Sequence, residues 1–472
     1  MSSFKKLLAG AFALALTTAA HAEPSTTATI VRLTGSTAFR SATHSAIVAL
    51  FDAAPVAGYA GSSLSGSTQS FFYGQISSQP VIIETSWSGS TGGNQTVSGG
   101  IAINFLPDTL ADSTSTPSLV AAGGSIGNAT GGTQISSSGT FGTNSQIPDV
   151  GMSDSYQAAT PFNSPVDIDQ LVGVVGFKWV ANRGAAVTTL SATTTAGSPV
   201  VALASTSGLA AGMTVSSTSL PTATLLKILS VDSSTQVTLT SGTGVLVGIN
   251  VSTTFVTPCP ISNINPQNAQ ALYSNGTAKL AAFTGNPADT QLVYACGRDP
   301  DSGTRLTAFA ETGIGVTSSV TQYLPVIASG AITSLAPYAP ETVNGIHFLT
   351  GNGGESSGGN LAKFFNASSA AINSGNGGYI IGYLSTGDAP TAINGGGKEL
   401  SYNGVFYSIQ DVQEGHYTFW TYEHLMYPTG LVSGKKSIAD KLAARIQNFD
   451  APIQLSSMHC SRASDGGVVY HN

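Results

Sequence analysis

The polar and apolar residues near the start of the chain change from a strand pattern to a helix pattern. Residues 27–33 alternate around Ile30, Val31 and Leu33, which predicts a β-strand. After the turn Thr34-Gly35-Ser36-Thr37, the helical period places one set of side chains on a single face: Phe39, Thr43, Ala46, Ile47 and Leu50. The chain therefore opens with a strand, a small-residue turn and a helix.

Later stretches repeat this order. The strand-like run 80–85 is followed by small residues in 86–93, and the run 292–295 is followed by 297–305 and a helix-like segment, 306–311. A further segment, 148–155, brings a carboxylate, Asp154, in place of hydroxyl donors. Because open α/β sheets bind ligands at the carboxyl ends of their strands, we expect these turns to form a ligand site.

Residues 297–305, Gly-Arg-Asp-Pro-Asp-Ser-Gly-Thr-Arg, allow two interpretations. As an oxyanion cradle, Ser302 and Thr304 would donate hydroxyls, Gly303 would let a ligand approach the backbone, and Arg298 would add a charged fork of donors. As ordinary structure, the same residues would be a turn and an N-cap of the helix that follows. The segment by itself does not decide between them.

A change of composition marks an insertion between residues 184 and 255, which are rich in Thr, Ser, Val and Ala and contain almost no charge. Short apolar runs at 199–203, 213–215, 225–229 and 236–240 alternate with Gly, Ser and Asp turns. This spacing predicts a small all-β, sandwich-like module. Adhesion, spacing and a neutral decoration all remain open as its role.

The first residues are typical of a secretory signal peptide, which we place at 1–22. Lys5 and Lys6 precede an apolar stretch, and Ala20-His21-Ala22 is a small-x-small cleavage pattern. No later apolar run is long enough to span a bilayer. We therefore expect a soluble periplasmic or extracellular protein that begins near Glu23.

Charge and cysteine content exclude several classes of function. The 472 residues include only 9% charged residues, with a net charge of −7, and contain no basic patch suited to nucleic acid. The three cysteines allow one disulfide in an oxidising compartment, and we prefer Cys259 with Cys296 because the pair would brace the Arg298 loop. Neither a zinc-ligand spacing nor a nucleophile elbow is present, so we expect no metal, no cofactor and no enzymatic activity.

Four of these segments, in this order, resemble the periplasmic phosphate-binding protein of ABC-type phosphate uptake. The family pattern is a Gly-Ser/Thr turn, a Gly-Ser-Ser/Thr-Gly-Gly loop, a Gly-x-Ser-Asp segment and Arg-x-x-x-Ser-Gly-Thr. Here these motifs are Gly35-Ser36-Thr37, Gly89-Ser90-Thr91-Gly92-Gly93, Gly151-Met152-Ser153-Asp154 and Arg298 through Thr304. Each motif is short and common, but all four follow a signal peptide in the family's order.

Carried over by position, the resemblance implies that the ligand is phosphate or a similar tetrahedral oxyanion. It implies these ligand residues: Thr37, Ala38, Ser90, Asp154, Arg298, Ser302, Gly303 and Thr304. A carboxylate can only accept, so Asp154 would favour an anion that still carries a proton and would repel sulfate. Asp299 or Asp301 could orient Arg298, although both are also ordinary turn carboxylates.

The resemblance further implies a two-lobed, hinge-linked α/β fold, here with the inserted β module. We expect lobe one at 23–172 and 400–472, lobe two at 173–183 and 256–399, and the insert at 184–255. The Gly/Ser/Thr-rich stretch 94–148 is longer than in the family and is expected to be a surface loop or a lid. The implied function is solute capture for an ABC permease; the alternative is a secreted or cell-surface adhesion protein on the same scaffold.

Overall fold

The computed structural model describes residues 24–60, 64, 66–110, 119–126, 129–135, 144–162, 168–222, 225–343, 345–369, 371–372 and 376–471. The predicted signal peptide, 1–22, lies outside these ranges. Within them, no helix is both long enough and apolar enough to cross a lipid bilayer.

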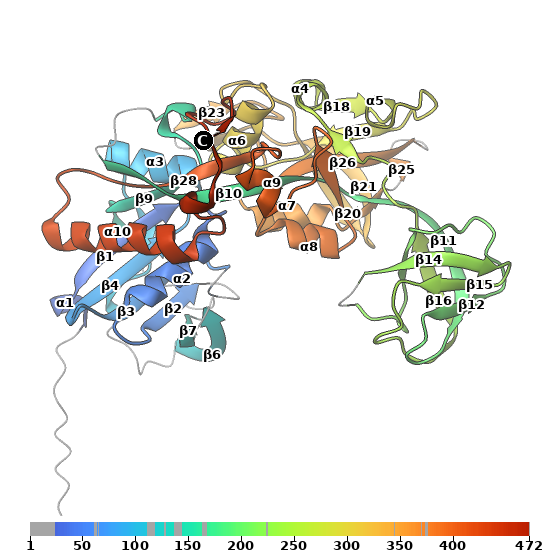
Figure 1. Ribbon diagram of the computed structural model, residues 1–472, viewed down its shortest axis with the longest axis horizontal. Coiled ribbons are helices and arrows are strands. Elements are labelled where there is room, and N and C mark those ends of the chain that lie inside the picture. Colours follow the sequence, from blue (N-terminus) through green and yellow to red (C-terminus); the bar gives the residue numbers. More distant parts are fainter. Residues whose placement is uncertain are drawn as a thin grey trace, which may run out of the picture.

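Lobe one is built on part of a large mixed sheet with the strand order β28-β9-β1-β4-β3-β2-β7-β6. β1 is parallel to both β4 and β9, so the carboxyl ends of these three strands lie at one edge. Figure 1 shows α3 on one side of this sheet and α2 with α10 on the other. The bounds are α1 Pro24–Thr27, β1 Thr29–Gly35, α2 Arg40–Leu50, β2 Val56–Ala60, β3 Gln69–Ile76, β4 Gln79–Ser86, α3 Ser90–Gly99, β9 Val150–Ser153, β28 Trp420–Tyr427 and α10 Ser433–Arg445.

The predicted first strand and helix are confirmed as β1 and α2. Phe39, Thr43, Ala46 and Ile47 are all fully buried, as the helical period required. The chain enters α2 from Gly35, whose φ of +124° and close approach to the Met152 backbone leave no room for a Cβ. This glycine therefore fixes the turn between β1 and α2 against β9.

The described part of the 94–148 stretch consists largely of short strands, and not of the expected loop or lid. β6 (Leu119–Ile126) pairs with β7 (Ala129–Ile135), and β7 pairs in parallel with β2 at the edge of the lobe-one sheet. A smaller pair, β5 (Ile103–Phe105) with β8 (Asn144–Gln146), lies beside the short helix η1 (Asp108–Leu110). The glycine and serine runs gave the wrong prediction of a loop, because backbone pairing at a sheet edge needs no apolar side chains.

Lobe two continues the same large sheet with the order β18-β19-β26-β10 and carries its own apolar cluster around Phe365, Ile380 and Leu384. Its helices and strands are β17 Asn263–Ile264, α4 Pro266–Asn275, β18 Thr277–Lys279, α5 Ala281–Thr284, β19 Leu292–Ala295, α6 Gly303–Glu311, β20 Tyr323–Ala328, β21 Ala331–Pro337, β22 Glu341–Val343, β23 Ile346–Phe348, α7 Gly358–Phe364, β24 Ser368–Ser369, β25 Ala371–Ile372, β26 Asn376–Ser385, α8 Ala389–Asn394 and β27 Lys398–Tyr402. β18 separates α4 from α5, and α7 ends at Phe364.

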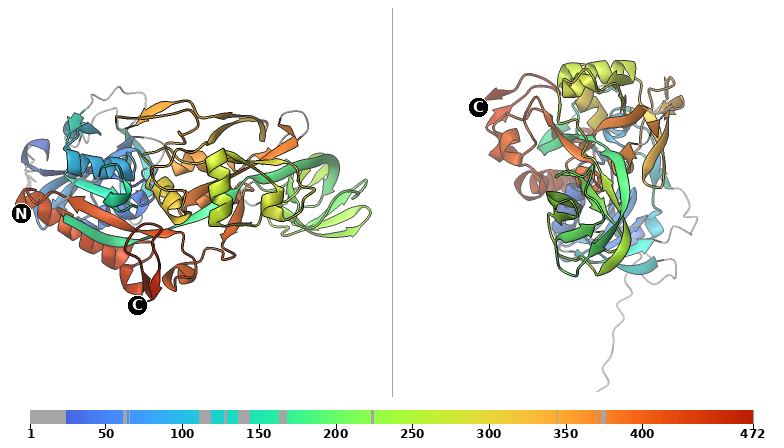
Figure 2. Two further views of the ribbon diagram at one scale, coloured as in Figure 1. Left: turned by 90° about the horizontal axis from the view of Figure 1, so that it is seen from above. Right: turned by 90° about the vertical axis from the view of Figure 1, so that its right-hand side faces the viewer.

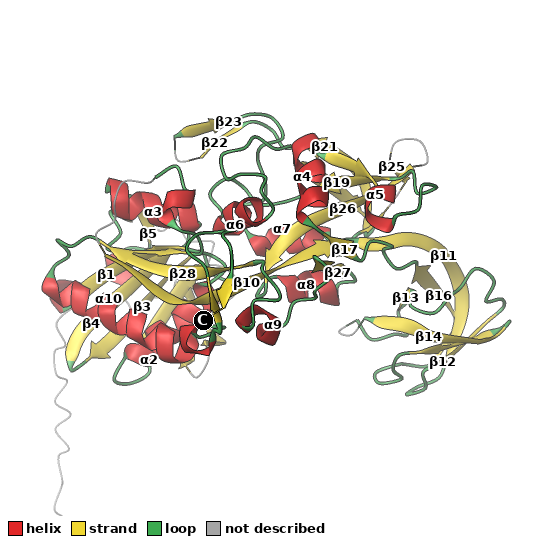
Figure 3. Ribbon diagram, turned by 45° about the horizontal axis from the view of Figure 1, so that its top comes forward, coloured by secondary structure: helices red, strands yellow, loops and turns green. Residues whose placement is uncertain are grey.

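One long strand, β10 (Ile168–Ala181), joins the two lobes. Its first part pairs with β28 of lobe one, and its last part pairs with β26 and β27 of lobe two. Figure 3 shows β10 running between the lobes. The chain returns through α9 (Ile409–Gln413) to β28. The apolar residues 171–177 lie in β10, which therefore belongs to both lobes.

The insert forms an all-β body at one end of the molecule (Figures 1 and 2), and its sheet continues into lobe two because β11 pairs with β24. β11 (Arg183–Thr194) leads out of lobe two and β16 (Gly248–Val256) returns beside it, while β12 Val200–Leu203, β13 Thr214–Ser216, β14 Leu226–Ser233 and β15 Gln236–Leu239 lie between them. The module has its own core, which includes Val201, Ile228, Val237 and Phe255. The predicted fold class, a two-lobed α/β protein with an inserted all-β module, is thus confirmed. The expected sandwich is wrong, because β12 also pairs with β11 and the six strands of the insert close into one sheet.

The preferred disulfide between Cys259 and Cys296 is wrong, because all three cysteines are free and buried. Cys296 lies in the lobe-two cluster and its thiol donates to the Tyr323 carbonyl at 3.1 Å, whereas Cys259 belongs to the main core cluster. Both cysteines flank one segment of the sequence, but this did not reveal that their thiols lie in different core clusters. The domain bounds remain a prediction; of these, 172 falls inside β10 and 399 falls inside β27.

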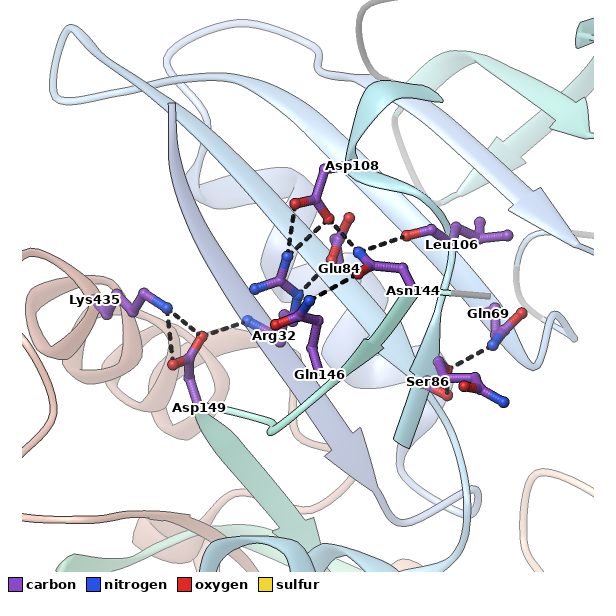
Figure 4. Close-up of polar contacts among 11 residues, drawn as sticks. Arg32, Gln69, Glu84, Ser86, Leu106, Asp108, Asn144, Gln146, Asp149 and Lys435 are labelled. Carbon is purple, nitrogen blue, oxygen red and sulfur yellow. Dashed lines mark hydrogen bonds and ion pairs between the residues drawn. The ribbon is translucent and has the colours of Figure 1, made fainter. Parts of the chain in front are cut away.

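A buried ionic network ties the strands of lobe one together (Figure 4). The Arg32 guanidinium donates to Glu84 at 2.9 Å and to Asp108 at 2.7 Å. Asp149 accepts from the Arg32 backbone N–H and from Lys435 of α10, both at 2.9 Å. The network therefore links β1, β4 and α10 to the loop that leads into β9.

Candidate functional site

The loops that follow β1, β4 and β9 meet at the shared carboxyl edge of these strands. The Gly89 N–H donates to the Gly35 carbonyl, and the Ser36 N–H donates to the Met152 carbonyl, both at 3.0 Å. These bonds hold the start of α3, the turn before α2 and the end of β9 against one another. The sequence predicted this arrangement because strand ends in a parallel set lie together.

Two of the predicted residues of lobe one are in direct contact. The Ser90 hydroxyl at the start of α3 donates to Asp154 Oδ1, and the Asp154 N–H donates back to Ser90 Oγ at 3.2 Å. Both side chains are almost completely buried. Ser90 and Asp154 therefore act as one paired unit at the surface of lobe one that faces lobe two.

The N-terminus of α6 in lobe two lies against this pair. A Cβ on Gly303 would fall 2.5 Å from Ser90 Oγ and closer still to Asp154 Oδ1. The Thr91 N–H donates to the Asp301 carbonyl at 3.1 Å, and the Thr307 hydroxyl donates to the Asp154 carbonyl at 3.1 Å. The lobes thus touch where two helix N-termini, those of α3 and α6, converge on one carboxylate.

Ser302 is the N-cap of α6, and its hydroxyl accepts from the Arg305 N–H at 3.4 Å. Thr304, in the first turn, is 2% exposed. The interpretation of this segment as a cap is therefore correct for Ser302. It does not exclude the cradle, because a cap leaves other N–H groups of the first turn without intrahelical partners.

Arg298 is buried beside this contact and is held by main-chain carbonyls. Its Nε donates to the Glu355 carbonyl at 2.9 Å and its Nη2 donates to the Ser356 carbonyl at 3.0 Å. These two bonds use two of the five guanidinium donors. Burial raises the pKa of Asp299 to about 6, and the Arg298 charge lowers it in part, so these two groups interact. That Asp299 or Asp301 orients Arg298 stays a prediction.

The electrostatics of Asp154 follow from its burial. Desolvation raises its pKa from 3.8 to about 6, while the Ser90 hydroxyl and the Arg298 charge lower it in part. Asp465, in the C-terminal segment, opposes them and raises the pKa. Arg298 and Asp154 are therefore close enough to interact, as a site formed by both lobes requires.

Thr37 and Ala38 lie elsewhere in the interlobe region and line a cavity of about 300 Å³. The remaining lining residues come from both lobes: Arg40, Ser41, Gly66, Ser385, Gly387 and Asp388. Ser90, Asp154, Ser302, Gly303 and Thr304 do not line it. The predicted ligand residues thus form two groups, one around the cavity and one around the Asp154 contact.

Arg40 connects these groups and was missed by the sequence analysis. Burial lowers its pKa, the nearby Arg298 charge lowers it further, and Asp388 raises it. Two guanidinium groups and one carboxylate thus lie near the cavity. A signal was present in the sequence, because a basic side chain in the first turn of a helix opposes the helix dipole and needs another reason to be there. Asp388 had a weaker signal, the turn Ser385-Thr386-Gly387 directly after a predicted strand.

Glu423 on β28 is a second residue that the sequence did not single out. It is completely buried, and its carboxyl group faces the Ser36 hydroxyl. Burial, followed by the charge of Asp154, raises its pKa well above 4.5. A charge on Asp154 therefore adds to the cost of ionising Glu423.

No group of three or more His, Cys, Asp or Glu side chains in the described part of the chain could hold a metal ion. His424 contacts Asp169 at 2.9 Å, and His416 and His459 each contact one surface carboxylate.

No family model and no curated relative matches the sequence. Several solved structures do. A Clostridium perfringens protein with bound phosphate, named as a phosphate ABC transporter substrate-binding protein, is 10% identical over 90% of this chain and 100% of its own, with a TM-score of 0.41. An ABC-type phosphate transport receptor from Vibrio cholerae is 9% identical over 88% of this chain and 93% of its own, with a TM-score of 0.39. PstS from Borrelia burgdorferi is 10% identical over 89% and 93%, with a TM-score of 0.34.

Proposed function

We propose that this chain is an extracytoplasmic solute-binding protein that captures phosphate, or a similar tetrahedral oxyanion, between its two lobes. The observation that carries the proposal is the meeting of Ser90, Asp154 and Gly303 across the lobes, next to Arg298. Each of these residue types was expected for an oxyanion site. These residues come from the segments that follow three different strands, β4, β9 and β19, and a simple N-cap would not require them to meet.

The donors around this point suit a tetrahedral oxyanion. The N-termini of α3 and α6 carry partial positive charge, and Arg298 retains guanidinium donors that its two carbonyl contacts do not use. Arg40 adds a second full charge at the neighbouring cavity. An anion held here would exchange its water for fixed, charge-assisted hydrogen bonds.

Asp154 would give the site its selectivity. A carboxylate can accept a hydrogen bond but cannot donate one while ionised, so it fits an oxyanion that still carries a proton. Hydrogen phosphate meets this condition near neutral pH, whereas sulfate would place an unprotonated oxygen against a buried charge. We infer that phosphate binds more tightly than sulfate.

Binding would involve the hinge. Gly303 lies so close to Asp154 that an anion touching both residues must enter while the lobes are further apart. The two connections, β10 and the segment around α9, would allow such a hinge motion. Transfer of the captured anion to an ABC permease is the transport role that we propose for this cycle.

Isothermal titration calorimetry of the mature chain tests the proposal. We expect phosphate to bind with a Kd on the order of micromolar or tighter, and sulfate to bind at least tenfold more weakly. The double variant Asp154→Asn, Arg298→Gln should lose phosphate binding while its circular dichroism spectrum stays that of the wild type. If neither phosphate nor sulfate gives heat with the wild-type chain, the proposal is wrong, and the adhesion alternative becomes the better interpretation.

A further inference from the structure

A second cavity lies where the inserted β module meets lobe two, and nothing in the proposed transport function uses it. Its volume is about 390 Å³. The insert and its two connections contribute Arg183, Gly184, Gly212, Thr214, Leu225, Lys227, Thr257, Pro258 and Cys259, and lobe two contributes Ile393, Gly396, Gly397, Lys398 and Glu399. It shares no lining residue with the interlobe cavity.

The lining of this cavity carries an excess of positive charge. Arg183, Lys227 and Lys398 are three of only 17 lysines and arginines in a chain whose net charge is −7. The single carboxylate in the lining, Glu399, is already paired with Lys178 at 2.8 Å. The three cations therefore lack a neutralising partner within the cavity.

Arg183 is the clearest sign that a partner belongs here. Its Nε is buried without a hydrogen bond, and the described residues offer its guanidinium no ion pair. Gly396, at a φ of +107°, brings its backbone close to this side chain, since a Cβ there would lie 3.2 Å from Arg183 Cδ. Burial lowers the pKa of Arg183, so the charge is held at a cost that a bound anion would offset.

The two lysines come from opposite walls. Lys398 of β27 donates to the Cys259 carbonyl at 2.7 Å, which uses one of its three ammonium donors. Lys227 of β14 belongs to the insert and is exposed. Its charge acts on Lys398, whose pKa is lowered by burial and then further by Lys227. The two like charges are thus held near each other across the junction, which an anion between them would stabilise.

We propose that this cavity is a second anion site, formed jointly by the insert and lobe two, that binds a small organic anion with at least two negative charges. Three cationic side chains carry more positive charge than one monovalent anion would neutralise. The apolar lining residues Leu225, Pro258 and Ile393 suit a carbon body, and about 390 Å³ lies within the usual range for small-molecule sites. Polycarboxylates and sugar phosphates share this chemistry.

Calorimetric titration of the mature full-length chain with citrate, and separately with fructose 1,6-bisphosphate, tests the site. Binding of at least one probe is expected, and it should weaken when NaCl is raised to about 0.5 M because the contacts are ionic. Lys227→Gln should weaken that binding tenfold or more, since Lys227 is exposed and forms no ion pair within the described residues. The matched control is Lys279→Gln, which removes the same charge from an exposed position on β18 outside the cavity and should change binding less than twofold.

Titration of Arg298→Gln separates this site from the interlobe site. The second site should bind its probe unchanged in that variant, even if the proposed phosphate function fails. Three results would overturn the inference: no binding of either probe, equal binding by the Lys227 and Lys279 variants, or loss of probe binding in Arg298→Gln alone. Arg183→Gln, at the connection between lobe two and the insert, should also weaken probe binding tenfold or more at an unchanged melting temperature, and wild-type probe affinity in this variant would likewise overturn the inference.

Discussion

Gly303→Ala is the substitution that most directly tests whether the lobes close on the Asp154 contact. The added Cβ would lie 2.5 Å from Ser90 Oγ, 2.7 Å from Ser90 Cβ and nearer still to Asp154 Oδ1. Ordinary contact begins near 3.4 Å, so α6 and the Ser90 loop must move apart by about 0.9 Å at Ser90 and by more at Asp154. Because Ser90 and Asp154 are almost fully buried, neither side chain has free space to turn into.

Overpacking of this kind costs about 1–3 kcal/mol. Here the cost falls on the closed arrangement of the lobes and not on either lobe alone, because the clash is between lobes. A closed form less stable by about 1–3 kcal/mol corresponds to about 5- to 150-fold weaker binding of a ligand that requires closure. Folding itself should not suffer, since Ala in the first turn of α6 favours the helix by up to about 1 kcal/mol relative to Gly.

The assay is phosphate titration by calorimetry, combined with small-angle X-ray scattering and thermal unfolding. Gly303→Ala should bind phosphate at least fivefold more weakly and show a larger radius of gyration, with an unchanged or higher melting temperature. Gly434→Ala is the matched control, because Gly434 lies in the first turn of α10 and a Cβ there meets nothing within 4 Å. Wild-type affinity in Gly303→Ala, together with an unchanged radius, would refute the closure mechanism.

Three further predictions concern buried charges. Asp154→Asn should stabilise the protein at pH 7 by up to about 3 kcal/mol, because the folded pKa of Asp154, about 6, lies above its unfolded value of 3.8 and its ionisation therefore opposes folding. Chemical denaturation should show that this gain disappears as the pH falls towards 4. Glu423→Gln should become more stable relative to wild type as the pH rises from 5 to 8, because burial raises the pKa of Glu423 and its ionisation opposes folding. An equal difference in stability between variant and wild type at both pH values would contradict this. Arg32→Met should lower the free energy of unfolding by about 3 kcal/mol or more, because it leaves Glu84 buried without its cation. The control Lys436→Met removes a cation from an exposed ion pair and should barely change the melting temperature. Similar effects of the two substitutions would show that the buried network is unimportant.

Several features were readable from the sequence because they depend on local patterns. The helical period of 39–50 gave the buried face of α2, and the alternation over 27–33 gave the strand β1. The short strands of the insert were predicted with small shifts at their ends, because turn residues separate them regularly. Local pattern also placed Ser302 at a helix start, which the structure confirms as the N-cap.

Other features could not be read because they depend on which segments meet in space. The disulfide between Cys259 and Cys296 was inferred from their shared segment, but the two thiols belong to different core clusters. The Gly/Ser-rich stretch before Asp149 was expected to be a loop, yet its described part pairs at a sheet edge, where hydrogen bonding depends on the neighbouring strand. Arg40 entered the site only through the position of lobe two.

By itself, the sequence determined the alternation of strands, turns and helices, the inserted β module, and a set of small-residue turns at strand ends. These follow from backbone propensities and from the periods at which apolar side chains recur. Only the tertiary structure decided that Asp154 meets Gly303 across the lobes, that Arg298 is held by main-chain carbonyls, and that Arg183, Lys227 and Lys398 line one cavity. Such contacts join residues up to some 200 positions apart, and their electrostatics arise from burial, which no local pattern records.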